Sequence, residues 1–263
     1  MPDPLILLER QGPIARLKLN QPKSLNAISL AAVEALDDLL KKLAEDSGVR
    51  VLVISGEGRA FMAGGDLGYL KEAGPAGAPR QASNLITKLH ATMERLTDLP
   101  FPVLASVHGA VAGAGISLML ACDFAIAAAD CRFVFAYSSI AACPDGGMSW
   151  SLPRMLGLRR ALDFAFLDTT MNAAEAERHG LVNRIVAPAE LGAHTDQIAA
   201  KLAAAPTTAF RETRRLMRGS FERSWKEQLK AEHDGFIACT KTEDFHEGIA
   251  AFFERRPSAF KGR

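Results

Sequence analysis

The sequence predicts an α/β core followed by a helical C-terminal segment. Short apolar runs typical of buried strands alternate with longer stretches of helical periodicity, the connections are short, and the pattern after Gly147 is mostly helical. A chain of 263 residues is long for one small domain and short for two. We therefore expect one core over residues 1–187 and an appended helical segment over residues 188–263.

The N-terminal part reads as a hairpin followed by a helix and a strand. Residues 5–9 and 14–19 form two short strands around the hairpin signal Gln11-Gly12-Pro13. Ser29 can cap a helix with a continuous apolar face. The apolar run at residues 49–55 is then a buried strand.

The middle of the chain continues this alternation. We expect, in order, a glycine-rich loop at residues 56–67, a flexible break at 74–79, a helix over about 81–97, a strand at 103–107, a second glycine-rich loop at 108–117, an apolar helix up to Ala121, and strands at 124–127 and 132–135.

Each of the two glycine-rich loops follows an apolar strand and opens a helix. Such a junction leaves backbone N–H groups without partners, and the positive partial charge at the helix start favours an anion or a developing oxyanion. Glycine lets a ligand approach these amides closely. The loops could each supply one donor to the same oxygen; the alternative is that the glycines only serve tight turns and helix packing.

Other functions for these glycines fail on spacing. Gly113-Ala114-Gly115 lacks the third glycine of the dinucleotide fingerprint, and no GxxxxGK[ST] phosphate loop occurs. Gly115-Ile116-Ser117 begins like the nucleophile elbow of hydrolases but lacks its second glycine.

Composition argues against several classes of protein. The formal net charge is +1, so neither a nucleic acid nor a membrane surface is expected as the main partner. No apolar run reaches the roughly 18 residues that span a bilayer, and the N-terminus carries no signal-peptide pattern. The four cysteines lack CxxC spacing. We therefore expect neither a zinc site nor a disulfide framework, and a reducing cytoplasm as the compartment.

Segments along nearly the whole chain resemble the enoyl-CoA hydratase/isomerase (crotonase-like) family, in the family's order. These segments are residues 21–27, 60–67, 107–123, 144–147, 152–154, 173–186 and 248–257. The resemblance implies a spiral of repeated β-β-α units with a C-terminal helical trimerisation layer, although no repeat is visible in the sequence itself. It also implies an acyl-CoA thioester substrate, which brings coenzyme A with it, no other cofactor, no metal, and a homotrimer or a hexamer made of two trimers.

The resemblance assigns roles to particular residues. The amides of Gly65 and Ala114 correspond to the two donors that hold the thioester oxygen. Ala114 stands where the family often has glycine, a change that keeps the backbone donor. The residues implied to contact coenzyme A are Lys23, Ser24, Leu25, Ala63, Asp66, Leu67, Phe236 and Arg255. The last two are expected to close the site, often from a neighbouring subunit, while His108 is expected to support its own loop.

The acid and base groups differ from those of hydratases in this family. Their two glutamates correspond here to Ser117 and Tyr137, and neither side chain is a good base near neutral pH. Asp145 is the carboxylate that remains, in a Pro-Asp-Gly-Gly context similar to that of some family isomerases. We expect it to move a proton between two carbons of an enoyl-CoA thioester; its alternative role is the N-cap of a following helix.

Three other functions stay open at this point. In 4-chlorobenzoyl-CoA dehalogenases, an aspartate nucleophile, an aromatic residue and a histidine that acts as base on water correspond to Asp145, Tyr137 and His90. An enoyl-CoA hydratase is the second alternative, and a CoA-binding homologue without turnover is the third. His90 has a further alternative role as an ordinary residue of an amphipathic helix.

Overall fold

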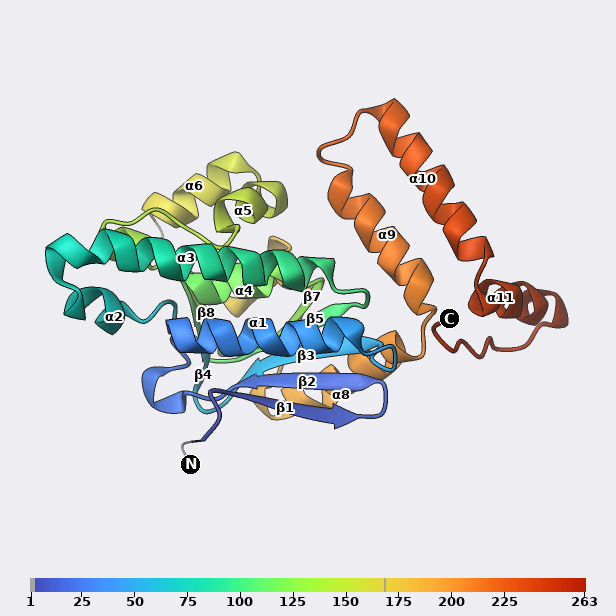
Figure 1. The fold of residues 1–263 in the computed structure, drawn as a ribbon, viewed down its shortest axis with the longest axis horizontal. Helices are drawn as coiled ribbons and strands as arrows, with labels where there is room; N and C mark the ends of the chain where they lie inside the picture. The colour runs from blue at the N-terminus through green and yellow to red at the C-terminus, as the bar shows by residue number, and fades with distance from the viewer. Residues whose placement is uncertain (1–2, 168) are drawn as a thin grey trace.

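Two sheets form the core of the structure, a computed structural model that describes residues 3–167 and 169–263 (Figure 1). The larger sheet has the strand order β1-β2-β3-β5-β7-β10 and the smaller one the order β4-β6-β8-β9. The strands of the larger sheet are β1 Ile6–Gln11, β2 Ile14–Leu19, β3 Val51–Gly56, β5 Val103–Val107, β7 Phe124–Ala128 and β10 Arg184–Val186. Those of the smaller sheet are β4 Ala60–Met62, β6 Ala110–Ala112, β8 Arg132–Val134 and β9 Thr170–Asn172.

Consecutive strands divide between the two sheets in a repeated way. In the pairs β3 and β4, β5 and β6, and β7 and β8, the first strand joins the larger sheet and the second joins the smaller one. Neighbouring strands from successive pairs are parallel, and helices separate the pairs. This arrangement confirms the α/β class and the repeated β-β-α units.

Helices pack around the sheets. The core helices are α1 Leu30–Glu45, α2 Leu67–Glu72, α3 Gly74–Asp98, α4 Ala114–Ala121, α5 Met148–Leu156, α6 Leu158–Phe166, α7 Ala173–Arg178 and α8 Leu191–Ala203. Figure 1 shows α1 and α3 side by side in front of the larger sheet, with α8 behind its strands. As predicted, the Ser29 hydroxyl caps α1 by accepting a hydrogen bond from the Ala32 N–H.

The flexible break predicted at residues 74–79 is wrong, because α3 starts at Gly74 and runs through Pro79 for 25 residues. Pro75 lies in the first helical turn, where its missing N–H would have no partner in any case. Pro79 removes only one further hydrogen bond close to the start of a long helix, and that local loss is small beside the packing of α3 against α1.

The last three helices stand away from the core in Figure 1. They are α9 Thr207–Gly219, α10 Trp225–Thr240 and α11 Glu243–Glu254. Half-buried Asp123 anchors α9 to the core, since its Oδ1 lies 2.7 Å from Arg214 Nε and 2.9 Å from Arg218 Nη2. The division of the chain at residue 187 stays a prediction; α8, just beyond it, packs against β3, β5 and β7.

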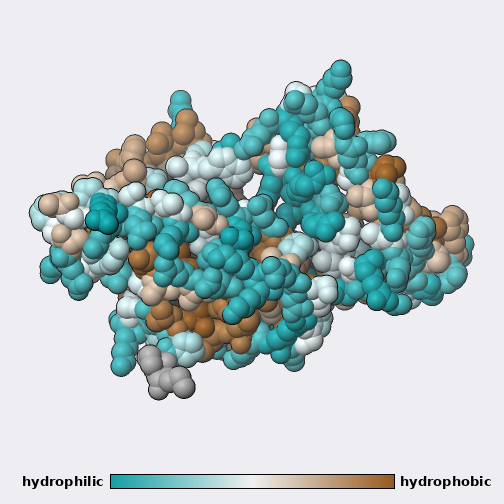
Figure 2. Space-filling view, viewed as in Figure 1, coloured by the Kyte–Doolittle hydropathy of each residue, from teal (hydrophilic) through white to brown (hydrophobic). Residues whose placement is uncertain are grey.

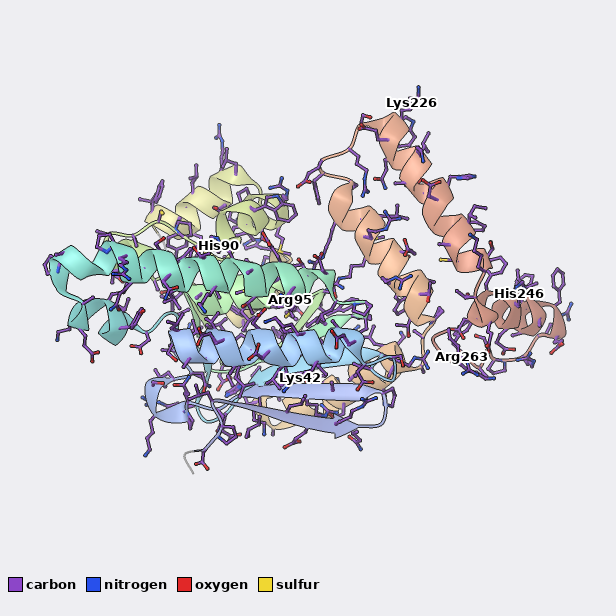
Figure 3. The ribbon with its side chains drawn as sticks, in the orientation of Figure 1. Lys42, His90, Arg95, Lys226, His246 and Arg263 are labelled. Atoms are coloured by element: carbon purple, nitrogen blue, oxygen red, sulfur yellow. The ribbon has the colours of Figure 1, made fainter. Side chains whose placement is uncertain are left out.

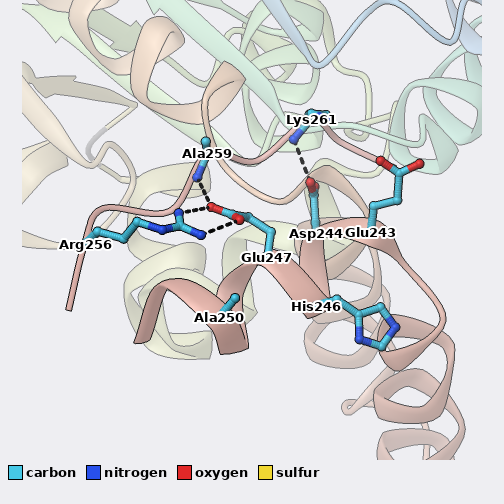
Figure 4. Close-up of a pocket in the computed structure, with 8 residues that line it drawn as sticks. All are labelled: Glu243, Asp244, His246, Glu247, Ala250, Arg256, Ala259 and Lys261. Carbon is cyan, nitrogen blue, oxygen red and sulfur yellow. Dashed lines mark hydrogen bonds and ion pairs between the residues drawn. The ribbon is translucent and has the colours of Figure 1, made fainter. Parts of the chain in front are cut away.

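The C-terminal tail folds back along α11 (Figure 4). Both Glu247 carboxylate oxygens accept hydrogen bonds from Arg256, and one also accepts from the Ala259 N–H at 2.8 Å. The Asp244 carboxylate accepts from the Lys261 and Gly262 amides. These residues, apart from Gly262, line a surface pocket between α11 and the tail. The polar groups named here already form hydrogen bonds with one another.

Large apolar side chains remain exposed on several parts of the molecule. Figure 2 shows them over α5 and α6, at the upper left, and at the right-hand end over α11. Examples are Leu158 and Phe166 on α6 and Phe252 and Phe253 on α11. Within the described residues, no helix combines the length and the apolar character needed to cross a bilayer.

Candidate active site

The two glycine-rich loops meet in the structure. The predicted loops are not wholly loop, because they contain the adjacent parallel strands β4 and β6. A methyl carbon placed on Gly113 would lie 3.5 Å from Gly64 Cα, so the two backbones approach each other closely here. Gly64 and Gly113 both have positive φ, at 97° and 49°, a conformation that costs glycine little.

The amide of Gly65 is left without an acceptor by the local pairing. The Ile28 N–H donates to Gly64 O at 2.8 Å and the Asp66 N–H donates to Ile28 O at 3.0 Å. This parallel bridge uses the groups on either side of the Gly65 amide and not the amide itself. Within residues 3–167 and 169–263, no acceptor is found for it.

The amide of Ala114 is free for a different reason. Ala114 is the first residue of α4, and the first amides of a helix have no intrahelical acceptor. Glycine at position 115 allows the start of α4 to lie close to β4, because a Cβ there would be only 2.3 Å from Met62 O. The close contact of β4 with α4 therefore depends on glycine at position 115 and brings the Ala114 amide next to the first loop.

Asp145 and Tyr137 form a hydrogen-bonded pair. The Tyr137 hydroxyl donates to Asp145 Oδ1 at 2.5 Å. Burial, and then the bond to Asp145, raises the pKa of the Tyr137 phenol well above its ordinary value. Tyr137 therefore stays protonated near neutral pH and acts as a donor to the carboxylate, not as a base.

The backbone of Asp145 is also held. The Ser117 hydroxyl donates to Asp145 O at 2.9 Å, and the Met148 N–H donates to the same oxygen at 3.2 Å. The N-cap role considered for Asp145 is wrong, because the N-cap of α5 is Gly147 and no side chain caps this helix. The Asp145 carboxylate thus remains available for chemistry.

His90 reaches the same segment from the middle of α3 (Figure 3). Its Nε2 accepts a hydrogen bond from the Gly146 N–H at 3.2 Å, across 56 positions of sequence. Gly146 has a φ of 59°, and a Cβ there would lie 2.9 Å from Ser117 Cβ. Glycine is thus required where Asp145, Ser117 and His90 converge.

Residues expected to contact coenzyme A from the N-terminal part lie beside the first loop. Lys23 and Ser24 belong to the 3₁₀ turn η1 Pro22–Ser24, and Leu25 follows it. Leu25 O accepts from the Ala63 N–H at 3.0 Å, which ties the two segments together. The Asp66 carboxylate caps α2 at the Gly68 N–H, while the next residue, Leu67, is exposed.

Phe236 and Arg255 are not brought to this site within one chain. Phe236 lies on α10, is 64% exposed and packs edge-to-face on Phe245. Arg255 ends α11 in a left-handed conformation. Both belong to the C-terminal helices that stand away from the core in Figure 1.

The sequence analysis missed Asn26 and Gly146 as supporting residues. Asn26 is 3% exposed, and its side chain contacts the backbone of Gln21, Glu57, Ala60 and Phe61. A buried asparagine has no local sequence signal, whereas the Gly146-Gly147 pair was used only as the sequence context of Asp145. His108 contacts the other glycine-rich loop and not its own, because its Nε2 lies 2.8 Å from Gly58 O. No metal-binding cluster of His, Cys, Asp or Glu is found among the described residues.

Comparisons with known proteins identify relatives of this chain. A family model described as Enoyl-CoA hydratase/isomerase matches residues 9–263. The chain is 32% identical to the 1,2-epoxyphenylacetyl-CoA isomerase of Escherichia coli K12, over 98% of both chains. It is 30% identical to the crotonyl-CoA hydratase of Syntrophomonas wolfei, over 97% of both. A crystal structure of an enoyl-CoA hydratase from Bacillus anthracis superimposes with a TM-score of 0.92 at 30% identity, over 99% of this chain and 100% of that one.

Proposed function

The chain belongs to the enoyl-CoA hydratase/isomerase family, and from this premise we propose that it isomerises a double bond of an enoyl-CoA thioester, with Asp145 as acid and base. The hydrogen bond from Tyr137 to Asp145 carries this proposal. It orients one carboxylate oxygen, while Oδ2 has no hydrogen-bond partner among the described residues. A free carboxylate oxygen can take a proton and return it.

The reaction needs only one such group. Asp145 takes a proton from the carbon between the thioester carbonyl and the double bond, and the electron pair spreads onto the thioester oxygen and over the double bond as a dienolate. The carboxylic acid then returns the proton to the far end of this system, and the double bond shifts by one position. The substrate brings coenzyme A with it, and no metal or other cofactor takes part in these steps.

The two free amides have the role of oxyanion donors in this proposal. Gly65 and Ala114 lie on loops that touch at Gly64 and Gly113. Neither amide is used by the protein backbone around it. Fixed donors aimed at a developing oxyanion are typically worth about 10²–10³ each in rate.

Hydration is less well supported by the side chains present. Ser117, at one of the two positions where hydratases of the family have glutamate, uses its hydroxyl on the backbone of Asp145. Tyr137, at the other, is a protonated donor to the Asp145 side chain. Neither residue is left to activate water.

A hydrolytic reaction in which Asp145 attacks the acyl group is the second candidate. The observation that favours it is the position of His90, which touches the segment that carries Asp145. In that reaction His90 would have to accept a proton from water. The non-enzymatic alternative is a protein that binds acyl-CoA without converting it.

The Asp145→Asn variant tests the proposal. Asparagine keeps the shape of the side chain and an oxygen that can accept from Tyr137, but it is not a base. The variant is expected to fold and bind CoA thioesters while losing nearly all isomerisation. Asp163→Asn, on the exposed face of α6, is the matched control.

Two measurements read out this test. Mass spectrometry identifies the products from a panel of enoyl-CoA and aroyl-CoA thioesters, which separates isomerisation, hydration and hydrolysis. Exchange of the α- and γ-protons with deuterated water should require Asp145. Full activity in Asp145→Asn would reject both enzymatic proposals for this residue.

A homotrimer, or a hexamer of two trimers, is part of the same proposal. The exposed apolar side chains on α6 and α11 support it, because apolar patches of this kind usually mark an interface. A neighbouring copy would also bring Phe236 and Arg255 to a site that they do not reach within one chain. Light scattering at micromolar concentration is expected to show the assembly, and a stable monomer there would contradict it.

A further inference from the structure

We infer that His90 is a positioning residue for Asp145 and not a base. The inference rests on the proposed function and adds to it a residue that acts through the backbone. Gly146, the residue after Asp145, donates its N–H to His90 Nε2 at 3.2 Å. His90 thus holds the chain one residue from the reacting carboxylate.

The direction of this hydrogen bond decides what His90 can do. A backbone N–H is only a donor, so Nε2 must offer its lone pair to it. In a neutral imidazole the proton then resides on Nδ1. With one nitrogen accepting and the other protonated, neither nitrogen is left to take a proton from water.

The surrounding residues restrict the position of Gly146. Its φ of 59° is a conformation that costs glycine little. A Cβ there would lie 2.9 Å from Ser117 Cβ and 3.6 Å from the Met93 side chain. Ser117 from α4 and His90 from α3 thus hold adjacent residues, the first at Asp145 O and the second at Gly146 N.

Three side chains from different elements therefore hold Asp145 and the backbone beside it. Tyr137 donates to its side chain, Ser117 to its carbonyl oxygen, and His90 accepts from the next amide. Loss of the His90 acceptor leaves the Gly146 N–H without a protein partner and removes one of the three. We expect the turnover number to depend on this contact more than substrate binding does, because the contact holds the backbone one residue from the reacting carboxylate.

A pair of variants separates an acceptor from a base. In His90→Gln, the amide oxygen of glutamine can accept from the Gly146 N–H but cannot act as a base. In His90→Leu, the side chain has a similar size but no atom that can accept from the Gly146 N–H. Glu94→Gln, on an exposed position one turn further along α3, is the control for charge and helix effects.

We expect His90→Leu to lower kcat about tenfold with a much smaller change in KM, as for the loss of one hydrogen bond. His90→Gln should stay within about twofold of the wild type, and Glu94→Gln should be unchanged. Equal, severe losses in His90→Gln and His90→Leu would identify a base and overturn the inference. Wild-type kinetics in both variants would overturn it as well.

Amide hydrogen exchange supplies a measurement that does not depend on activity. The Gly146 amide should exchange faster in His90→Leu than in the wild type, and at the wild-type rate in His90→Gln. Unchanged exchange in both variants contradicts the positioning role. If the wild type showed no Asp145-dependent isomerisation, the proposed reaction would fail, while the exchange rates would still decide the role of His90.

Discussion

The hydroxyl of Tyr137 lies 2.5 Å from Asp145 Oδ1, eight positions away in the sequence. Tyr137 belongs to the 3₁₀ turn η2 Tyr137–Ile140, and Asp145 follows this turn in the loop before α5. The phenol is 9% exposed and edge-on to Phe135, so apolar packing fixes the ring while its hydroxyl reaches the carboxylate. The pair joins a rigid donor to the group that the proposed reaction uses.

The Tyr137→Phe variant is expected to lower kcat by about 10- to 100-fold, the range for losing a hydrogen bond to a charged group. The ring and its packing are kept, so KM and folding should change little. Steady-state kinetics on the preferred enoyl-CoA checks this. Tyr69→Phe, which alters the other tyrosine of the chain, should behave like the wild type; an equal loss in both variants would speak against a specific role of the pair.

The ionisation of Tyr137 should occur above its ordinary pKa of about 10, because burial and the bond to Asp145 favour the protonated phenol. Its contribution to stability is then complete below about pH 10 and is lost as the pH rises toward the pKa of the folded state. Ultraviolet titration at alkaline pH measures the ionisation of Tyr137 as the difference between the wild type and Tyr137→Phe. A difference curve centred at or below pH 10 would contradict the buried pair.

The Ala114→Pro variant removes one of the two free amides while keeping a residue that suits the first position of a helix. We expect kcat to fall by about 10²–10³, as for the loss of one oxyanion donor. Ala114→Gly keeps the N–H and should retain most of the activity. Circular dichroism verifies that both variants fold, and an active, folded Ala114→Pro protein would show that this amide is not a donor in the reaction.

The Asn26→Ala variant should lower the free energy of unfolding by about 3 kcal/mol, because it leaves several buried backbone groups without partners. These groups include the carbonyls of Ala60 and Phe61, next to the first glycine-rich loop. Chemical denaturation measures the change. Asn84→Ala, on an exposed position of α3, should leave the free energy of unfolding nearly unchanged. An equally small change in Asn26→Ala would contradict the prediction.

The sequence by itself determined the features that depend on neighbours along the chain. Apolar runs followed by glycines at residues 56–67 and 108–117 predicted strand–loop–helix junctions, and those junctions form. Ser29 caps α1 because an N-cap bond joins residues three positions apart. The resemblance to a known family supplied the repeated β-β-α units, which have no repeat that can be seen in the residues.

Weak local signals were misread or missed. The strands of the smaller sheet have three residues each; β8 was predicted, but β4, β6 and β9 are too short for a period of two to be recognised. The glycines and prolines at residues 74–79 indicate a break when considered alone. They lie in a helix because the rest of α3 packs against α1, and such packing outweighs local propensity.

The contacts of the candidate site were decided only by the tertiary structure. Asp145 meets Tyr137 from eight positions away and Ser117 from 28, and Gly146 meets His90 from 56. Residue types along the chain show that a carboxylate, a phenol and an imidazole are present. They do not show that Tyr137 donates, that Ser117 is used on the backbone, or that His90 accepts. Those roles follow from the direction of each hydrogen bond, which exists only once α3, α4 and the loop before α5 have packed together.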